Sequence, residues 1–166
     1  MKALIYLMLI SSSILARAQI PGSFSLPLDD LQLNSRYGYR VHPLTGKVKF
    51  HAGVDLAARS DTVFAVLDGR VTKSGYNHSL GLYVNLDHGG GLESSYGHLS
   101  QCWVLEGDTI RVGSPIGLTG ATGQVTGEHL HFAIKFYHRF LNPLALMKAL
   151  LLSQAGHQLP NMANHE

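Results

Sequence analysis

Residues 129–136 read HLHFAIKF, and this stretch alternates strictly between large apolar side chains and smaller or polar ones. The even positions from 130 to 136 are Leu, Phe, Ile and Phe, so all four fall on one face of an extended chain. A period of two predicts a β-strand with one face in the core. His129 and His131 then project together from the non-core face, with their Cα atoms roughly 6–7 Å apart.

Other short apolar runs follow the same plan between glycine-rich turns, and the 166-residue chain contains 18 glycines. Residues 63–67 and 82–87 are predicted strands. A turn at residues 88–91 leads into a returning strand at residues 92–98, which places His98 at a strand end. This succession of short strands is typical of antiparallel sheets.

One helix is predicted, near the C-terminus. Asn142 is a suitable cap, Pro143 suits the first helical position, and good helix formers continue to Leu152. We therefore expect a mainly β fold, with antiparallel sheets and one short C-terminal helix.

The N-terminus has the features of a secretory signal. Lys2 supplies a positive charge, residues 3–14 are almost wholly apolar or small, and residues 16–18 form an A-x-A cleavage pattern. The apolar run is well short of the roughly 20 residues that cross a bilayer, so no membrane span is expected after its removal. An exported protein, periplasmic or extracellular, is the expectation.

These features divide the chain into four segments. Residues 1–18 are the predicted signal peptide, residues 19–33 a lead-in segment and residues 34–152 the single domain. Residues 153–166 are polar and are expected to form a disordered tail.

Charge and cysteine content exclude some classes of function. The chain has 13 basic and 11 acidic residues, and removal of Lys2 and Arg17 leaves 11 of each. A mature chain without net charge does not predict a nucleic-acid partner. The single cysteine, Cys102, cannot form an internal disulfide and is interpreted as a small buried apolar residue.

Histidine is the residue type that points to chemistry, with ten in the chain. Zinc binds His nitrogen and carboxylate oxygen, and a catalytic zinc site has three protein ligands and one open position. The candidates are His51, Asp55, His98, His129 and His131. One histidine of the 129/131 pair can bind the metal while its neighbour lies beside a bound water.

The His51–Asp55 spacing needs a break in the strand. A straight strand would hold their Cα atoms about 13 Å apart, too far for both to bind one ion. Gly53 is the position where the chain can kink or bulge and bring them together.

The other histidines lack such a pattern and are interpreted as ordinary solvated or satisfied residues. They are His42, His78, His88, His138, His157 and His165. Strand alternation points Glu128 to the opposite face from the pair, so it is not expected to be a general base.

In these residues the sequence resembles the M23 family of zinc metallopeptidases, the lysostaphin or LytM type. The resemblance extends from about residue 34 to 145, and several separate motifs occur in the family's order. The matching segments are residues 35–40 (SRYGYR), 42–46 (HPLTG), 51–55 (HAGVD), 95–100 (SYGHLS), 107–117, 119–123 (TGATG), 127–132 (GEHLHF) and 142–143.

This resemblance implies a LytM-like antiparallel β-sandwich with a long substrate groove. It implies that His51, Asp55 and His131 bind one Zn²⁺ ion and that His98 and His129 form the catalytic pair. It also implies that the substrate is a peptide of bacterial peptidoglycan, with a cell-wall, secretion or conjugation machine as a candidate protein partner.

The resulting hypothesis is a secreted zinc metallopeptidase that hydrolyses a cross-link or stem peptide of peptidoglycan by zinc-activated water. The alternative is a non-catalytic peptidoglycan-binding or hydrolase-activating module on the same fold, which the complete set of five residues disfavours. A third reading is a carrier domain, because residues 107–117 resemble the turns of biotinyl and lipoyl domains. The sequence has no lysine at a hairpin tip with the right flanking residues, which disfavours the carrier reading.

Two positions bear on specificity and latency. Thr45 lies about where some glycine-cleaving members have a substrate-side tyrosine, so cleavage of glycyl bridges is not predicted. Asn34 is a loose candidate for the upstream asparagine that blocks the zinc in latent members.

Overall fold

The computed structural model describes residues 23–41 and 46–157. The predicted signal peptide, His42, Thr45 and the residues beyond 157 lie outside these ranges. The described part contains twelve strands and one helix: β1 (Leu33–Ser35), β2 (Gly38–Val41), β3 (Val48–His51), β4 (Val54–Ala57), β5 (Thr62–Phe64), β6 (Gly69–Asn77), β7 (Gly81–Asp87), β8 (Leu92–Cys102), β9 (Thr109–Ile110), β10 (Pro115–Thr119), β11 (His129–Phe136), β12 (Arg139–Leu141) and α2 (Pro143–His157).

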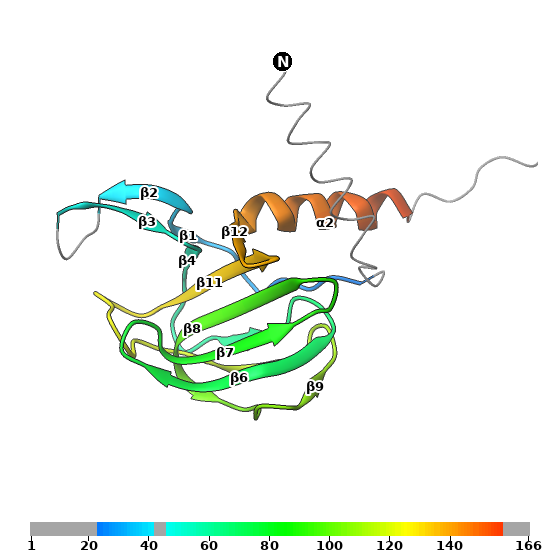
Figure 1. Ribbon diagram of the computed structural model, residues 1–166, viewed down its shortest axis with the longest axis horizontal. Coiled ribbons are helices and arrows are strands. Elements are labelled where there is room, and N and C mark those ends of the chain that lie inside the picture. The colour runs from blue at the N-terminus through cyan, green and yellow to red at the C-terminus, as the bar shows by residue number, and fades with distance from the viewer. Residues whose placement is uncertain (1–22, 42–45, 158–166) are drawn as a thin grey trace, which may run out of the picture.

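Most strands belong to one curved, antiparallel sheet of ten strands (Figure 1). Its main order is β1-β4-β11-β8-β7-β6-β9, while β10 joins β5 to β8 and β12 pairs with β11. Strands β2 and β3 form a separate two-stranded hairpin that projects from one end. The prediction of a mainly antiparallel β fold with one C-terminal helix is confirmed.

Strand β11 lies between β4 and β8, and its apolar side chains enter the core as predicted. Leu130, Phe132 and Ile134 are at most 1% exposed. His131 and Ala133, however, are buried as well. The prediction that their face lies outside the core is therefore wrong, because the side chains that converge on His131 cover that face.

Strand lengths differ from the prediction in two places. β5 ends at Phe64, although the apolar run continues to Leu67 and stays buried. Beyond Phe64 the backbone leaves the ladder: the N–H of Ala65 donates to the Ser114 carbonyl and that of Val66 to the Tyr96 hydroxyl, each at 3.0 Å. β8 continues to Cys102, so its end is not at residue 98.

The helix begins as predicted. The Leu144 N–H donates to Asn142 Oδ1 at 3.1 Å, which caps the first turn, and Pro143 occupies the first helical position. The helix continues to His157, so the predicted end at residue 152 is wrong and the start of the expected tail is helical. Gln154 and Ala155 are good helix formers, which favours this continuation.

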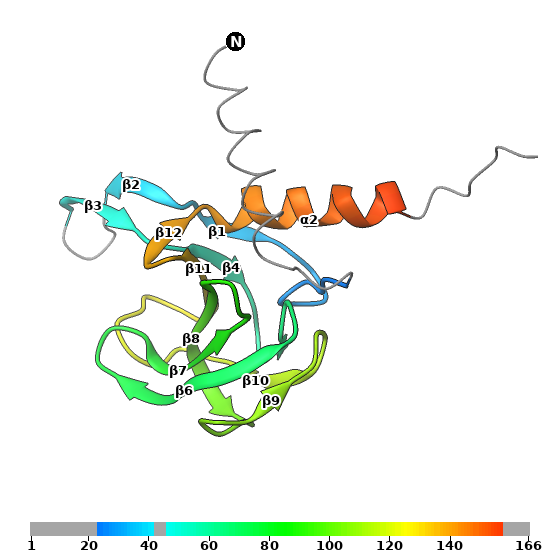
Figure 2. The same cartoon turned by 45° about the vertical axis from the view of Figure 1, so that its right-hand side comes forward.

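Helix α2 lies beside the β11–β12 hairpin, as two views of the molecule show (Figure 2). Met147 and Leu150 are buried and anchor the helix to the sheet. Within residues 23–41 and 46–157, no helix has both the length and the apolar character that crossing a membrane requires.

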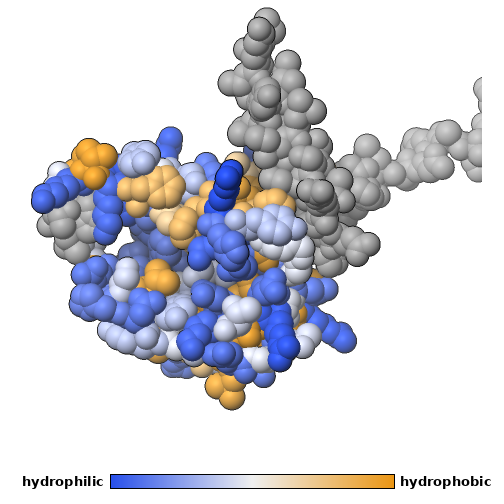
Figure 3. Space-filling model, viewed as in Figure 1, coloured by the Kyte–Doolittle hydropathy of each residue, from blue (hydrophilic) through white to orange (hydrophobic). Residues whose placement is uncertain are grey.

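The β2–β3 hairpin has two unlike faces. Tyr39 and Val41 are 81% and 63% exposed, and they share a face with Val48 of the partner strand. Figure 3 shows apolar surface on this hairpin. Gly38 and Arg40 alternate with the exposed residues and are more buried, so they lie on the inner face of the hairpin.

Candidate metal centre and active site

The chain breaks between His51 and Asp55, at the position where the sequence predicts a kink. Strand β3 ends at His51 and β4 begins at Val54, so the two residues lie in different sheets. His51 Nε2 is 3.1 Å from Asp55 Oδ1. A Cβ atom at Gly53 would overlap the Phe132 carbonyl oxygen and lie 3.0 Å from the His131 ring, so the close approach of β4 and β11 requires glycine.

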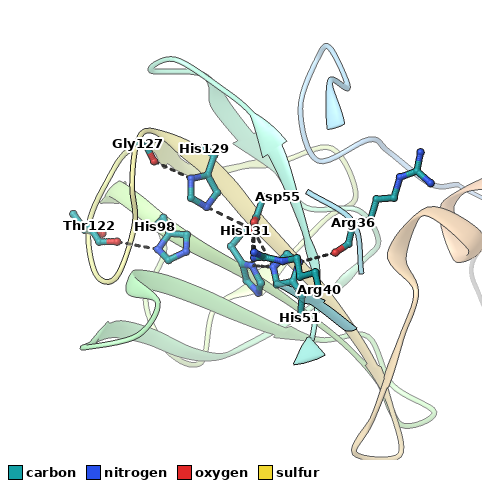
Figure 4. Close-up of polar contacts among 9 residues, drawn as sticks. All are labelled: Arg36, Arg40, His51, Asp55, His98, Thr122, Gly127, His129 and His131. Atoms are coloured by element: carbon teal, nitrogen blue, oxygen red, sulfur yellow. Dashed lines mark hydrogen bonds and ion pairs between the residues drawn. The ribbon is translucent and has the colours of Figure 1, made fainter. Parts of the chain in front are cut away.

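The pairing of β4 with β11 places His131 directly opposite Asp55. His131 Nδ1 lies 2.9 Å from Asp55 Oδ1 and 3.1 Å from His51 Nε2. One atom from each of three strands therefore meets at a single point (Figure 4). Together His51, Asp55 and His131 form a group that could hold a metal ion.

The tautomer of His51 is fixed by its surroundings. Its Nδ1 donates to the Arg36 carbonyl at 2.9 Å, so the neutral ring presents the lone pair of Nε2 to Asp55. A lone pair and a carboxylate oxygen at 3.1 Å repel each other unless a proton or a cation lies between them. This local excess of acceptors is what a cation site requires.

His98 reaches the same region through an irregularity of strand β8. The β7–β8 pairing shifts between Leu82 and Val84, which gives β8 one extra residue opposite this step. His98 occupies this bulge with a φ of 64°, a left-handed conformation that is uncommon outside glycine. The bulge re-aims the side chain, and its Nδ1 donates to the Thr122 carbonyl at 2.9 Å.

His129 is held in the same way. Its Nδ1 donates to the Gly127 carbonyl at 2.8 Å, and its Nε2 lies 3.5 Å from Asp55 Oδ1. The rings of His98 and His129 have centroids 4.7 Å apart. Both rings therefore have their Nδ1 tied to the backbone, and both leave Nε2 free of a backbone partner (Figure 4).

Burial and hydrogen bonds within the cluster shift the pKa values of its side chains. Burial alone would raise the pKa of Asp55, but hydrogen bonds with His131 and His51 outweigh it and hold that pKa far below its usual value. Burial lowers the pKa of His131, against the opposing effect of Asp55. Burial also lowers the pKa of His98 to about 4, with His129 and His131 adding to the effect. Asp55 is thus anionic and the buried rings are neutral, which is the state that a cation needs.

Sequence reasoning missed Arg40. Its Nη2 lies 3.3 Å from Asp55 Oδ2, the carboxylate oxygen that faces away from the histidines. The alternation of residues 38–41 gives no signal for it, because the apolar residues Tyr39 and Val41 are the exposed ones in this hairpin. The carbonyls of Arg36, Thr122 and Gly127 were also missed, because no side-chain pattern marks a backbone acceptor.

Other candidates lie outside the cluster. Glu128 accepts hydrogen bonds from the Thr119 hydroxyl and the Ser60 N–H, as a structural residue does. Asn34 lines a separate pocket of about 530 Å³, together with Glu128 and Ala57, and does not cover the three candidate ligands. The exposed ring of His78 pairs with Gln124 at 3.1 Å.

Cys102 packs against the core but is only partly buried, less deeply than its interpretation as a small buried residue expected. Burial raises the pKa of its thiol, which keeps it protonated.

A fold and a site of this kind define a class of metal-dependent peptidases. The profile of Peptidase family M23 matches residues 49–143, which include the five predicted site residues. This chain belongs to peptidase family M23.

Two relatives illustrate the match. The DD-carboxypeptidase/endopeptidase Mpg of Neisseria meningitidis serogroup B is 37% identical over 130 residues, which are 77% of this chain and 30% of that protein. The peptidoglycan DD-endopeptidase ShyC of Vibrio cholerae is 41% identical over 108 residues, 64% of this chain and 25% of that protein. The chain thus spans less than a third of either relative.

Solved structures agree with the fold. A zinc-containing peptidase from Vibrio cholerae superimposes with a TM-score of 0.67 at 33% identity, covering 75% of this chain and 39% of that one. The catalytic domain of lysostaphin from Staphylococcus simulans gives a TM-score of 0.65 at 27% identity, covering 71% and 92%. The LytM-like fold class predicted from the sequence is confirmed.

Proposed function

We propose that this chain is an exported zinc metallopeptidase that hydrolyses peptide bonds in bacterial peptidoglycan. The observation that carries the proposal is the meeting of His51 Nε2, Asp55 Oδ1 and His131 Nδ1 within 2.9–3.1 Å of one another. Family membership and the names of the relatives support the reaction and the substrate.

The donor set fits zinc. Four ligands at about 2.0–2.1 Å around a tetrahedral zinc lie roughly 3.3 Å from each other. The three donor atoms are 2.9–3.1 Å apart, so a small shift of each side chain would admit the ion. Two imidazoles and one carboxylate leave one position for water, as in catalytic zinc sites.

The remaining two histidines supply the proton chemistry. When bound, zinc polarises the scissile carbonyl and lowers the pKa of the water it holds to about 7. His98 and His129 each direct Nε2 toward this region while their Nδ1 protons are held by carbonyls. One ring accepts a proton from the attacking water at Nε2. The other takes up a proton from solvent at Nε2 and, as an imidazolium, stabilises the oxyanion or protonates the leaving amine.

The substrate bond is proposed from the relatives. Mpg and ShyC are both named for action on D,D bonds, and ShyC for action on peptidoglycan. We therefore assign this chain the D,D cross-link between two stem peptides. The predicted signal sequence supports a location outside the cytoplasm, which agrees with a peptidoglycan substrate.

The test is digestion of defined muropeptides by the purified chain, with the products identified by mass spectrometry. Cross-linked dimers should yield monomers, a chelator should stop the reaction, and zinc should restore it. Loss of only the terminal D-alanine from pentapeptides would indicate a carboxypeptidase instead.

The matched control is His78→Ala, which removes an exposed histidine that pairs with Gln124 and is not among the five predicted site residues, and it should leave digestion unchanged. A wild-type chain that binds one zinc ion per molecule but releases no fragment from any muropeptide would contradict the proposal. That result would favour the alternative, a wall-binding or hydrolase-activating module.

A further inference from the structure

Arg40 occupies a position that its own hairpin does not explain. Its neighbours Tyr39 and Val41 point to solvent, whereas its side chain turns inward and is only 27% exposed. The Nε atom of Arg40 is buried and has no hydrogen-bond partner. Burial of a guanidinium group is costly unless an anion lies beside it, and Asp55 is the acidic residue within ion-pair distance.

The two oxygens of Asp55 have different neighbours. Oδ1 faces His51 and His131 at 3.1 and 2.9 Å. Oδ2 faces Arg40 Nη2 at 3.3 Å. The carboxylate is therefore divided between a side that meets the histidines and a side that Arg40 holds.

The backbone alone does not fix this division. Asp55 is anchored by the pairing of β4 with β1 and β11, but rotation of its carboxylate would exchange the two oxygens or turn both toward the cluster. Arg40 comes from the β2–β3 hairpin, which is not hydrogen-bonded into the large sheet. Its contact with Oδ2 opposes that rotation.

We propose that Arg40 is a positioning residue: it holds Oδ2 of Asp55 so that the carboxylate binds the metal through Oδ1 alone. The inference rests on the proposed metal site, but not on the identity of the bond cut. Arg40 has two opposed effects on zinc affinity: its positive charge beside the cation weakens binding, and its hold on the carboxylate strengthens binding. We expect the second effect to be the larger.

The test measures zinc affinity by competition with a chromogenic chelator in the full chain. Arg40→Gln should bind zinc roughly 10- to 100-fold more weakly, as is typical when a partner of a metal ligand is removed. Arg40→Lys should fall between this variant and the wild type, because an ammonium group retains the charge and one donor but loses the fork.

The matched control is Arg36→Gln. Arg36 is exposed, and its side chain points away from the cluster, while the substitution keeps the carbonyl that accepts from His51 (Figure 4). Its zinc affinity should equal that of the wild type. Thermal unfolding without metal shows whether each variant folds, and Arg40→Lys carries the test if Arg40→Gln does not.

A second readout separates positioning from general destabilisation. Cobalt(II) in place of zinc gives intense visible absorption when four-coordinate and weaker absorption when a carboxylate adds its second oxygen. The bound cobalt in Arg40→Gln should therefore absorb less per ion than in the wild type. A role that is only structural would reduce occupancy without changing the spectrum of the bound ion.

Unchanged or increased zinc affinity in Arg40→Gln would overturn the inference, as would an equal loss in Arg36→Gln. A wild-type chain that binds no zinc would instead contradict the proposed metal site itself. The two failures are therefore distinguishable.

Discussion

Strand β8 contributes to two clusters that each contain histidine but differ in how hydrogen-bond donors and acceptors are matched. His98, within the strand, joins His129 and His131 near Asp55. Nearer its start, Ser94 and Tyr96 form a hydrogen-bonded chain with His88. Both clusters are largely buried, so burial does not distinguish a reactive site from a structural one.

The His88 cluster is closed. His88 Nδ1 donates to the Asp68 carbonyl at 2.8 Å, and its Nε2 lies 2.7 Å from Ser94 Oγ. Ser94 Oγ is 3.0 Å from the Tyr96 hydroxyl, which also accepts from the Val66 N–H. The hydroxyl protons can be placed so that each link has one donor and one acceptor with His88 neutral. Burial lowers the pKa of His88, in agreement with that state.

The Asp55 cluster is open. Three ring nitrogens surround one oxygen of Asp55 at 2.9, 3.1 and 3.5 Å, and His51 has already used its proton on the Arg36 carbonyl. Acceptors therefore outnumber donors. The comparison teaches that unbalanced lone pairs, rather than the number of histidines, mark the place for a cation.

The largest expected effect comes from removing a proposed metal ligand from the open cluster. His131→Ala removes one of three proposed ligands, so zinc affinity should fall by more than the roughly 10- to 100-fold cost of losing an outer partner. Hydrolysis should fall below detection. Metal analysis of the purified variant checks this, and zinc retained at full stoichiometry would refute the ligand assignment.

The next effect separates binding from chemistry within the open cluster. His129→Ala should reduce hydrolysis by roughly 10²- to 10⁴-fold, the usual contribution of a positioned acid or base. Most of the zinc should remain, because His129 is not one of the three converging donors. The measurements are kcat on a cross-linked muropeptide and zinc content. Equal zinc loss in His129→Ala and His131→Ala would show that the pair is not divided in this way.

A change in the closed cluster should affect stability alone. His88→Ala leaves Ser94 and the Asp68 carbonyl without their partner, which should lower the free energy of unfolding by about 1–3 kcal/mol. Urea unfolding of the metal-free chain measures this loss. Zinc affinity should be unchanged at a temperature where the variant is folded, and a tenfold drop would erase the distinction between the clusters.

The smallest expected effect is at a histidine outside both clusters, which serves as the reference for the other histidine substitutions. His78→Ala removes an exposed ring whose contact is with Gln124, so stability should change by no more than about 0.5 kcal/mol. Zinc affinity should equal that of the wild type in the same chelator assay. A larger change in either quantity would mean that histidine removal as such disturbs this fold, and the other variants would need that correction.

Much of the site was predictable because its signals are local. Alternation in residues 129–136 predicts the strand, and Gly53 marks the break that lets His51 reach Asp55. His98 was predicted as a candidate but placed at a strand end, because a bulge depends on pairing with β7 and leaves no mark in the sequence of β8. Arg40 was missed because its partner lies 15 residues away and across a sheet boundary.

The sequence by itself determined the strand periodicity, the helix cap and the residue types of the site, since each depends on neighbours along the chain. Only the tertiary structure decided which atoms meet. Register alone sets His131 opposite Asp55 on β4 and opposite Gly97 on β8, and a slip of one residue would turn every histidine of β11 to the other face. The pKa values of the site likewise arise only when the strands are packed together: hydrogen bonds with His131 and His51 hold the pKa of Asp55 low against the effect of burial, and burial lowers the pKa of His98.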